Sequence, residues 1–213
     1  NTPEINYSLS FDGVDDYVGG AASSSLDVTS TNRITLSAWI KINDFSNSQT
    51  IFAHGVDGDN GNNQYSLNIT TDGLLYFITA GANGSSGSFE DGTNNTSLTP
   101  LTLDYWHHVA LTYDGAAIKM YLDGILDFQH DIVDNFPNNT GSFHIGSSSN
   151  PSNFFNGNIT DVKVWNISRS QSELQSDMLT VLSGNESGLV GYWNFNEGEG
   201  DVLTDLSGNG NNG

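Results

Sequence analysis

Residues Trp106–Gly124 read WHHVALTYDGAAIKMYLDG, and this stretch contains two Asp-Gly dipeptides, each at the end of an apolar run. Asp-Gly between apolar runs is typical of a tight β-hairpin, because a type I′ turn needs positive φ at both central residues. A third dipeptide, Asp72-Gly73, separates the runs Gln64–Thr70 and Leu74–Thr79. Three such turns predict strands that return antiparallel to one another.

Hydrophobic alternation extends the strand prediction to the rest of the chain. Residues Ile34–Ile42 place Ile, Leu and Ala at even positions and Thr, Ser, Trp and Lys at odd ones, the period-two pattern of a strand with one face in the core. Further strands are predicted at Tyr7–Phe11, Tyr17–Val18, Thr50–His54, Ile125–Phe128, Ser142–Ile145, Asn158–Trp165 and Leu189–Phe195. We therefore interpret residues 1–213 as one all-β domain, a two-sheet antiparallel β-sandwich with one short helix.

The single helix is predicted from a start signal near residue 170. Ser170 and Glu173 have the spacing of a capping box, in which each side chain bonds the other's backbone N–H. The apolar residues that follow fall on one helical stripe: Leu174, Met178, Leu179 and Leu182. With Gly184 as a stop signal, we expect a helix that packs across an edge or end of a sheet.

The composition is strongly acidic, with 25 Asp and Glu residues against 5 Lys and Arg, for a formal net charge of -20. Such a field repels phosphate backbones, so nucleic acid is excluded as a partner. It attracts divalent cations, and carboxylate and amide oxygens are the ligands that calcium takes. The alternative is that the acidic residues only keep the protein soluble, as in an organism living in salt, such as a marine one.

Cysteine is absent, which excludes disulfides, thiolate metal sites and a thiol nucleophile. No run approaches the ~18 apolar residues of a membrane span, so membrane insertion is not expected. The chain begins at Asn1 without a signal peptide. We interpret it as a domain excised from a larger secreted or cell-surface protein.

Several segments, taken in order, resemble the laminin-G-like, concanavalin-type jelly-roll domains that serve as accessory modules of bacterial surface proteins and polysaccharide-degrading enzymes. They are LSFDGVDDYV (Leu9–Val18), ITLSAWI (Ile34–Ile40), WHHVALTYDG (Trp106–Gly115), FNGNITDVKVW (Phe155–Trp165), GYWNFNEG (Gly191–Gly198) and DLSGNGNNG (Asp205–Gly213). The resemblance covers essentially the whole chain. It implies a jelly roll on a secreted or cell-surface bacterial protein, with glycans, or other domains of the same polypeptide, as partners.

The same resemblance implies a structural calcium at the edge where the terminal strands meet. By resemblance, Asp161 is the first expected ligand and Asp12 the second, with Asp15 and Asp205 as further candidates. Asp16 lies in the same acidic stretch. The alternative is that Asp12 and Asp205 only form Asx turns with the glycines that follow them.

A second candidate calcium site is the loop DGDNGNN (Asp57–Asn63), where Asp57, Asp59 and Asn63 supply oxygen ligands on a glycine-rich backbone. The pattern departs from an EF-hand, because Gly61 falls at a ligand position and no Glu closes the loop. A polar, solvated loop is the alternative interpretation.

A glycan-binding surface needs polar side chains and an exposed aromatic ring on loops. The predicted ligand-binding residues are Asp57, Asn60, Asn62, Phe89, Phe154 and Phe155, because they lie in or beside loops. The four tryptophans lie within predicted strands, where core packing is expected. Of the neighbours His107 and His108, which point to opposite faces of a strand, one is expected half-buried and the other exposed.

Catalysis is the competing interpretation, because this fold class also contains glycoside hydrolases and lyases. The Glu-x-Asp-x-x-Glu pattern of laminarinase-type hydrolases is absent, and the five basic residues are scattered along the sequence. The leading hypothesis is therefore a non-catalytic, calcium-assisted carbohydrate-binding module. An adhesive or structural protein-interaction module of a cell-surface protein is the alternative, followed by a polysaccharide-active enzyme.

Overall fold

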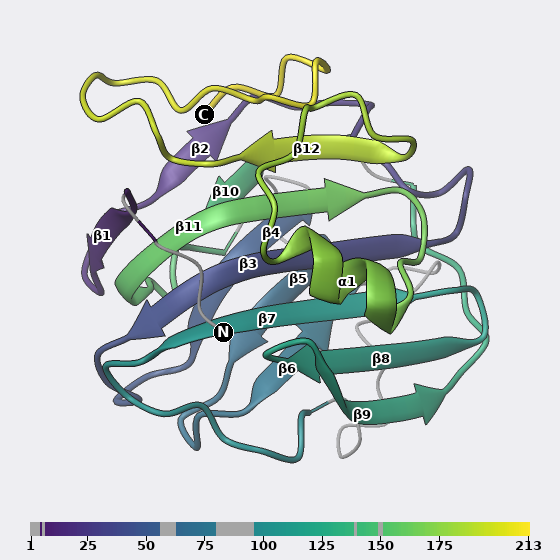
Figure 1. Ribbon diagram of the computed structural model, residues 1–213, viewed down its shortest axis with the longest axis horizontal. Coiled ribbons are helices and arrows are strands. Elements are labelled where there is room, and N and C mark those ends of the chain that lie inside the picture. The colour runs from purple at the N-terminus through teal and green to yellow at the C-terminus, as the bar shows by residue number, and fades with distance from the viewer. Residues whose placement is uncertain (1–4, 6, 56–62, 80–95, 139, 149–150) are drawn as a thin grey trace.

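The computed structural model describes residues 5, 7–55, 63–79, 96–138, 140–148 and 151–213. Within these residues, antiparallel strands form two sheets and there is one short helix, so the predicted all-β sandwich is confirmed (Figure 1). The strands are β1 (Leu9–Asp12), β2 (Val18–Gly20), β3 (Ile34–Ile42), β4 (Gln49–Gly55), β5 (Asn63–Ile69), β6 (Leu75–Ile78), β7 (Trp106–Tyr113), β8 (Ala117–Leu122), β9 (Ile125–Asp131), β10 (Phe143–Ile145), β11 (Asn156–Trp165) and β12 (Leu189–Trp193).

The larger sheet has seven strands in the order β1-β11-β3-β7-β8-β9, and β12 also pairs with β11. β1 pairs with residues 156–159 of β11 and β12 pairs with residues 162–165, so these two short strands share the outer edge of β11. The smaller sheet has the order β2-β10-β4-β5-β6 and lies behind the larger one in Figure 1. β2 is therefore an edge strand of its sheet, and β1 lies at the edge of the other.

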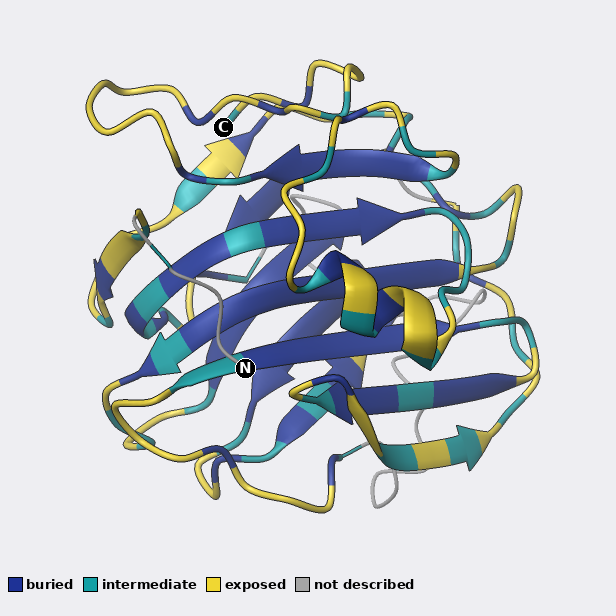
Figure 2. Ribbon diagram, viewed as in Figure 1, coloured by how far each residue is buried: buried dark blue, intermediate teal, exposed yellow. Residues whose placement is uncertain are grey.

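The core lies between the two sheets, where aromatic rings from both meet. Phe143 of the smaller sheet packs on Trp193 of the larger one, with ring centroids 4.8 Å apart, and Phe52 stacks on Phe143 at 5.9 Å. All three side chains are fully buried. Trp39 and Trp165 are buried as well, and β3, β7 and β11 are dark along most of their length in Figure 2. The core role predicted for the four tryptophans is confirmed for Trp39, Trp165 and Trp193, whereas Trp106 is only half-buried.

The helix α1 (Gln171–Asp177) begins with the predicted capping box between Ser170 and Glu173. It ends at Asp177, well before Gly184, and it covers the outer face of the larger sheet, not an edge or end as predicted (Figure 1). Leu174 packs against Ala110 of β7 and Tyr121 of β8. The helix therefore buries the odd-numbered face of β3, which carries Thr35, Ser37 and Trp39. No helix within the described residues is long and apolar enough to cross a membrane.

The three Asp-Gly dipeptides all lie in hairpins, since β5 pairs with β6, β7 with β8, and β8 with β9. Asp123 and Gly124 both have positive φ, 51° and 75°, as a type I′ turn requires. At the other two turns only the glycine has positive φ. Asp114 instead accepts hydrogen bonds from the N–H groups of Ala116 and Ala117, which makes a longer turn.

Candidate functional site

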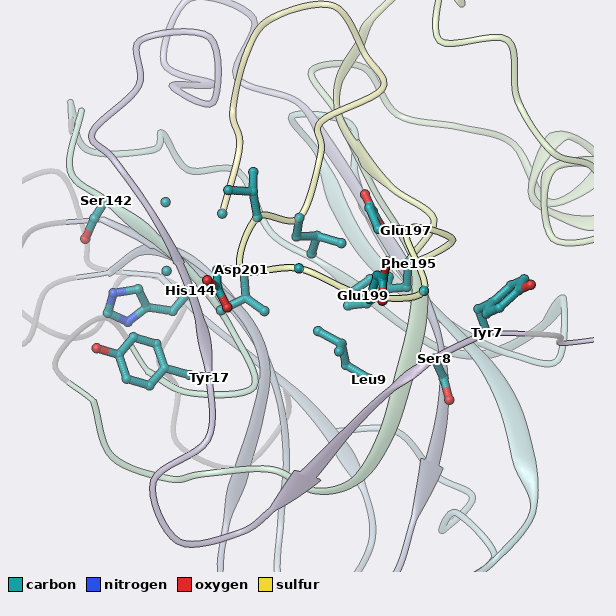
Figure 3. Close-up of a pocket in the computed structure, with 18 residues that line it drawn as sticks. Tyr7, Ser8, Leu9, Tyr17, Ser142, His144, Phe195, Glu197, Glu199 and Asp201 are labelled. Atoms are coloured by element: carbon teal, nitrogen blue, oxygen red, sulfur yellow. The ribbon is translucent and has the colours of Figure 1, made fainter.

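A groove of about 910 Å³ opens at one edge of the sandwich, between β1, β2 and the loop that follows β12 (Figure 3). Tyr7 and Tyr17 lie on opposite sides of it and are 52% and 45% exposed. Both rings are therefore free to contact a ligand. In Figure 3, Tyr17 lies beside His144 on one side of the groove and Tyr7 lies on the other, with the carboxylates of the loop between them.

The groove exists because both sheets end here and because two of the β2 residues that line it have no side chain. Gly19 and Gly20 line the groove. A Cβ on Gly20 would lie 1.9 Å from the Phe143 ring, so only glycine lets β2 lie this close to the core. Gly198 and Gly200, with φ of +76° and +111°, turn the loop on the opposite wall.

Tyr17 is held in place by two other rings. The His144 ring centroid lies 5.0 Å from that of Tyr17, and the Phe154 centroid lies 6.5 Å away. Nδ1 of His144 lies 2.6 Å from the carbonyl oxygen of Ser148, which fixes the imidazole. A ring that is already oriented loses little conformational freedom when it binds.

The wall of the groove formed by the loop after β12 carries three acidic side chains. Glu197, Glu199 and Asp201 alternate with glycines along the loop, and all three are exposed. Oε1 of Glu197 accepts a hydrogen bond from the N–H of Thr204 at 2.8 Å, which ties the two arms of the loop together. No Lys or Arg occurs among the lining residues. This wall accepts hydrogen bonds and repels anions.

Three of the acidic residues considered for calcium gather in the β1–β2 loop. Carboxylate oxygens of Asp12, Asp15 and Asp16 all lie within 4.8 Å of one another. Oδ1 of Asp12 also accepts from the N–H groups of Val14 at 2.8 Å and Asp15 at 3.3 Å, which is the Asx turn considered as the alternative. These backbone bonds, chiefly that from Val14, lower the pKa of Asp12.

Asp161 and Asp205 do not join this cluster. Asp161 lies in an ion pair with the buried Lys163, at an irregularity in β11. Asp205 accepts backbone hydrogen bonds from Tyr192, Ser207 and Asn211 inside the C-terminal tail. Each carboxylate thus has a partner in the protein. Within the described residues, Asp12, Asp161 and Asp205 do not form a group that could hold a metal ion, so the expected meeting of these three acids at one edge is not observed.

The predicted ligand-binding aromatics had different outcomes. Phe155 is completely buried and its ring packs edge-on against Phe11 at 6.1 Å, so its prediction as an exposed binding residue is wrong. Its neighbour Phe154 points the other way, is half-buried and contacts Tyr17. The remaining predicted residues Asp57, Asp59, Asn60, Asn62 and Phe89 lie outside the described residues. Asn63 begins β5, and its side chain lies outside the description too.

The groove residues Tyr7, Tyr17, His144 and Glu197 were not predicted from the sequence. One signal was available, the alternation Glu-Gly-Glu-Gly-Asp from residue 197 to 201, which is unsuited to a strand or a helix. The pairing of Tyr17 with His144 had no such signal, because these residues are distant in sequence and meet only when β2 pairs with β10.

The two packed antiparallel sheets, with an aromatic-lined groove at one edge, define a lectin-like β-sandwich. The chain belongs to the concanavalin A-like lectin/glucanases superfamily, because the laminin-G-type model of that superfamily matches residues 12–175. The resemblance noted in the sequence is thereby confirmed. A comparison with curated protein sequences found no match.

Solved structures with the same fold come from several sources. A proposed carbohydrate-binding protein from Bacteroides ovatus has a TM-score of 0.74 at 24% identity, over 98% of this chain and 57% of its own. The SAP-like pentraxin of Limulus polyphemus has a TM-score of 0.60 at 18% identity, over 94% of this chain and 92% of its own. Domain 4 of an extracellular arabinanase from Geobacillus stearothermophilus, in complex with arabinotriose, has a TM-score of 0.52 at 20% identity, over 80% of this chain and 71% of its own. At these identities the likeness shows the fold alone. The chain spans little more than half of the Bacteroides protein.

Proposed function

We propose that the chain is a non-catalytic carbohydrate-binding module that holds a glycan in the groove between Tyr7 and Tyr17. The observation that carries this proposal is the exposed Tyr17 ring, fixed by His144, facing a wall of hydrogen-bond acceptors. An aromatic face packs against the apolar C–H face of a sugar ring, and carboxylates accept charge-assisted hydrogen bonds from its hydroxyl groups. The acidic wall favours neutral glycans, or acidic ones bridged by calcium.

The arrangement of the carboxylates supports a non-catalytic role. A glycoside hydrolase needs two carboxyl groups that flank the bond to be cleaved. Glu197, Glu199 and Asp201 all come from one loop, so they approach a ligand from the same wall. The facing wall supplies Tyr17, Gly19 and Gly20, which carry no carboxylate.

The fold relatives support the biological setting that we propose. The Bacteroides protein is described as a proposed carbohydrate-binding protein. The arabinanase domain is described in complex with arabinotriose. We extend this to the present chain as an accessory module of a secreted or cell-surface protein, next to other domains of the same polypeptide. There it would raise the local concentration of an attached enzyme, or of the cell, on a polysaccharide.

Replacement of Tyr17 by alanine is expected to weaken glycan binding by about ten-fold or more, because the stacking surface is lost at a cost of about 1.4 kcal/mol or more. The measurement is affinity-gel retardation on arabinan, β-glucans and xylan. Tyr105→Ala is the matched control, since Tyr105 is 67% exposed but lies outside the groove. Equal losses in both variants, or no retention of the wild type on any gel, would overturn the proposal.

We also propose that calcium binds to Asp12, Asp15 and Asp16 and orders the β1–β2 loop beside the groove. A metal that binds only the folded state at 100 times its Kd stabilises that state by about 2.7 kcal/mol. For a domain of this size, that raises the Tm by roughly 5–10 °C. The residues fit the ion chemically, because calcium takes carboxylate oxygens in flexible geometry.

The calcium proposal is tested by the melting temperature in millimolar CaCl₂, in MgCl₂ and in chelator. The expected rise is specific to CaCl₂ and absent from Asp15→Asn. Asp72→Asn, which removes one charge from the distant β5–β6 turn, should keep it. Identical melting temperatures in CaCl₂ and chelator would contradict the proposal, and the Asp12 bonds would then act as an Asx turn alone.

A further inference from the structure

A second, smaller pocket of about 190 Å³ lies on the other side of the loop that follows β12, next to the end of helix α1. One part of its lining is apolar and the other part is polar. The apolar part includes Trp39, Met178 and Leu179, and the polar part includes Asp161, Asn194 and Asn196. Its size is below the ~300–1,000 Å³ of pockets for drug-sized ligands, so it has room for one small ring.

Only a thin wall separates this pocket from the groove. Asn194 and Asn196 line the pocket, whereas Phe195 and Glu197 line the groove. Tyr7 lines both cavities. A ligand with several rings in the groove therefore reaches the pocket by passing Tyr7.

Asp161 is presented to the pocket by an unusual backbone. Its φ is 54°, in the left-handed region that few non-glycine residues adopt, at the point where the pairing of β11 with β3 shifts register. Such irregularities cost energy, and they turn a side chain in a direction that a regular strand would not allow. The backbone is thus strained at the residue whose carboxylate lines the pocket.

The Asp161 carboxylate is open to a donor from outside the protein, because it lines the pocket and its side chain is 20% exposed. Within the protein, Lys163 donates to Oδ2. Burial raises the pKa of Asp161, although Lys163 and Tyr192 lower it. A neutral donor such as a hydroxyl group would stabilise the charged carboxylate.

Beside this carboxylate is the phenol of Tyr192. Tyr192 is a fully buried residue that lines the pocket. It lies close enough to Asp161 that the carboxylate helps to raise the pKa of the phenol, after burial. Because the Asp161 side chain is 20% exposed, a sugar hydroxyl in the pocket can donate to its carboxylate.

We propose that this pocket is a second saccharide subsite, which takes one sugar ring of a glycan whose other rings lie in the groove. The ring sets its apolar face towards Met178 and Leu179, above the buried Trp39, and its hydroxyl groups towards Asp161, Asn194 and Asn196. This inference rests on the proposed function. It adds that the module recognises a terminal or branching ring, in addition to a main chain.

The test blocks the mouth of the pocket without touching the groove. Val181 lines the pocket and is 74% exposed, so Val181→Trp fills the entrance at little risk to the fold. Val133→Trp is the matched control, because Val133 is 83% exposed and lies outside both cavities. Asn196→Ala removes a polar group from the exposed rim. The probes are six-ring oligomers of arabinan, β-1,3-glucan and xylan, titrated by calorimetry and by NMR of the Trp39 indole N–H.

With the oligomer that the wild type binds best, Val181→Trp and Asn196→Ala should each weaken affinity by about ten-fold, and Val133→Trp should leave it unchanged. The Trp39 indole resonance, whose N–H donates to the carbonyl of Met178, should shift on binding. Wild-type affinity in Val181→Trp together with a ten-fold loss in Tyr17→Ala would overturn the subsite and leave the groove standing. Binding of none of the oligomers by the wild type would overturn both.

Discussion

Replacement of Asp205 by alanine is expected to destabilise the protein by about 3–5 kcal/mol. Oδ1 of Asp205 accepts from the N–H groups of Tyr192 at 3.0 Å and Ser207 at 2.9 Å, and Oδ2 accepts from the N–H of Asn211 at 2.9 Å. Asp205 is 7% exposed, so its replacement by alanine would leave these backbone N–H groups with neither the carboxylate nor water as an acceptor. Each unsatisfied buried donor costs about 1–3 kcal/mol. The sum approaches the whole stability of an ordinary domain.

The lost hydrogen bonds of Asp205 should destabilise the whole C-terminal tail. The tail carries Asn211, whose carbonyl accepts the indole N–H of the core residue Trp193 at 2.8 Å, and Leu203, which pairs with Gly213 through two backbone hydrogen bonds. Urea unfolding followed by circular dichroism measures the change. Asp201→Ala is the control, since this carboxylate is exposed on the same loop. A loss below 1 kcal/mol in Asp205→Ala would show that the tail does not depend on this carboxylate.

Acidification from pH 7.5 to pH 5.0 is expected to reduce the contribution of two buried histidines to the free energy of unfolding by about 4 kcal/mol in total. Burial lowers the pKa of His54 to about 4, partly offset by Gln64 and Asp27. Burial, with a smaller contribution from Lys163, lowers the pKa of His108 to about 3. Both are therefore neutral in the folded protein at pH 5, whereas an unfolded histidine has a pKa of about 6.5.

The sign follows from proton uptake. Below pH 6.5 the unfolded chain binds protons that the folded His54 and His108 do not, so stability falls as the pH falls, until each folded pKa is reached. Because pH 5 lies about 1.5 units below the pKa of an unfolded histidine, each residue then lowers the free energy of unfolding by about 2 kcal/mol relative to pH 7.5. The carboxylates with lowered pKa, such as Asp44 and Asp114, act in the same direction but at lower pH.

The excess of negative charge opposes this effect, because its self-repulsion weakens on acidification. The decisive quantity is therefore the difference between the wild type and the double variant His54→Gln/His108→Gln, measured by urea unfolding at both pH values. The variant should lose about 4 kcal/mol less than the wild type over this interval. Equal losses in both proteins would show that these histidines take up protons in the folded state.

The strands were predictable from the sequence because their signal is local. Ile34–Ile42 alternates with period two, and β3 has these same bounds in the structure. The alternation does not reveal that helix α1 covers the second face. His108 is 1% exposed, and the His107 side chain, 14% exposed, contacts Asp123 at 2.9 Å. The expectation of one exposed histidine was therefore wrong.

The groove was not predictable, because its parts are joined only by tertiary structure. Tyr17 and His144 are brought together by the pairing of β2 with β10, and Glu197 reaches the groove through the path of the chain after β12. Phe154 and Phe155 show the limit of composition as a guide. Adjacent residues in extended chain face opposite ways, so only one of the pair was able to leave the core.

Binding of a glycan between Tyr7 and Tyr17 can be observed in a crystal structure of the protein soaked with the oligosaccharide that the gels retain best. We expect a sugar ring stacked on Tyr17, with hydroxyl groups bonded to the carboxylates of Glu197, Glu199 or Asp201. A well-ordered oligosaccharide on another surface, with the groove filled by water alone, would contradict it.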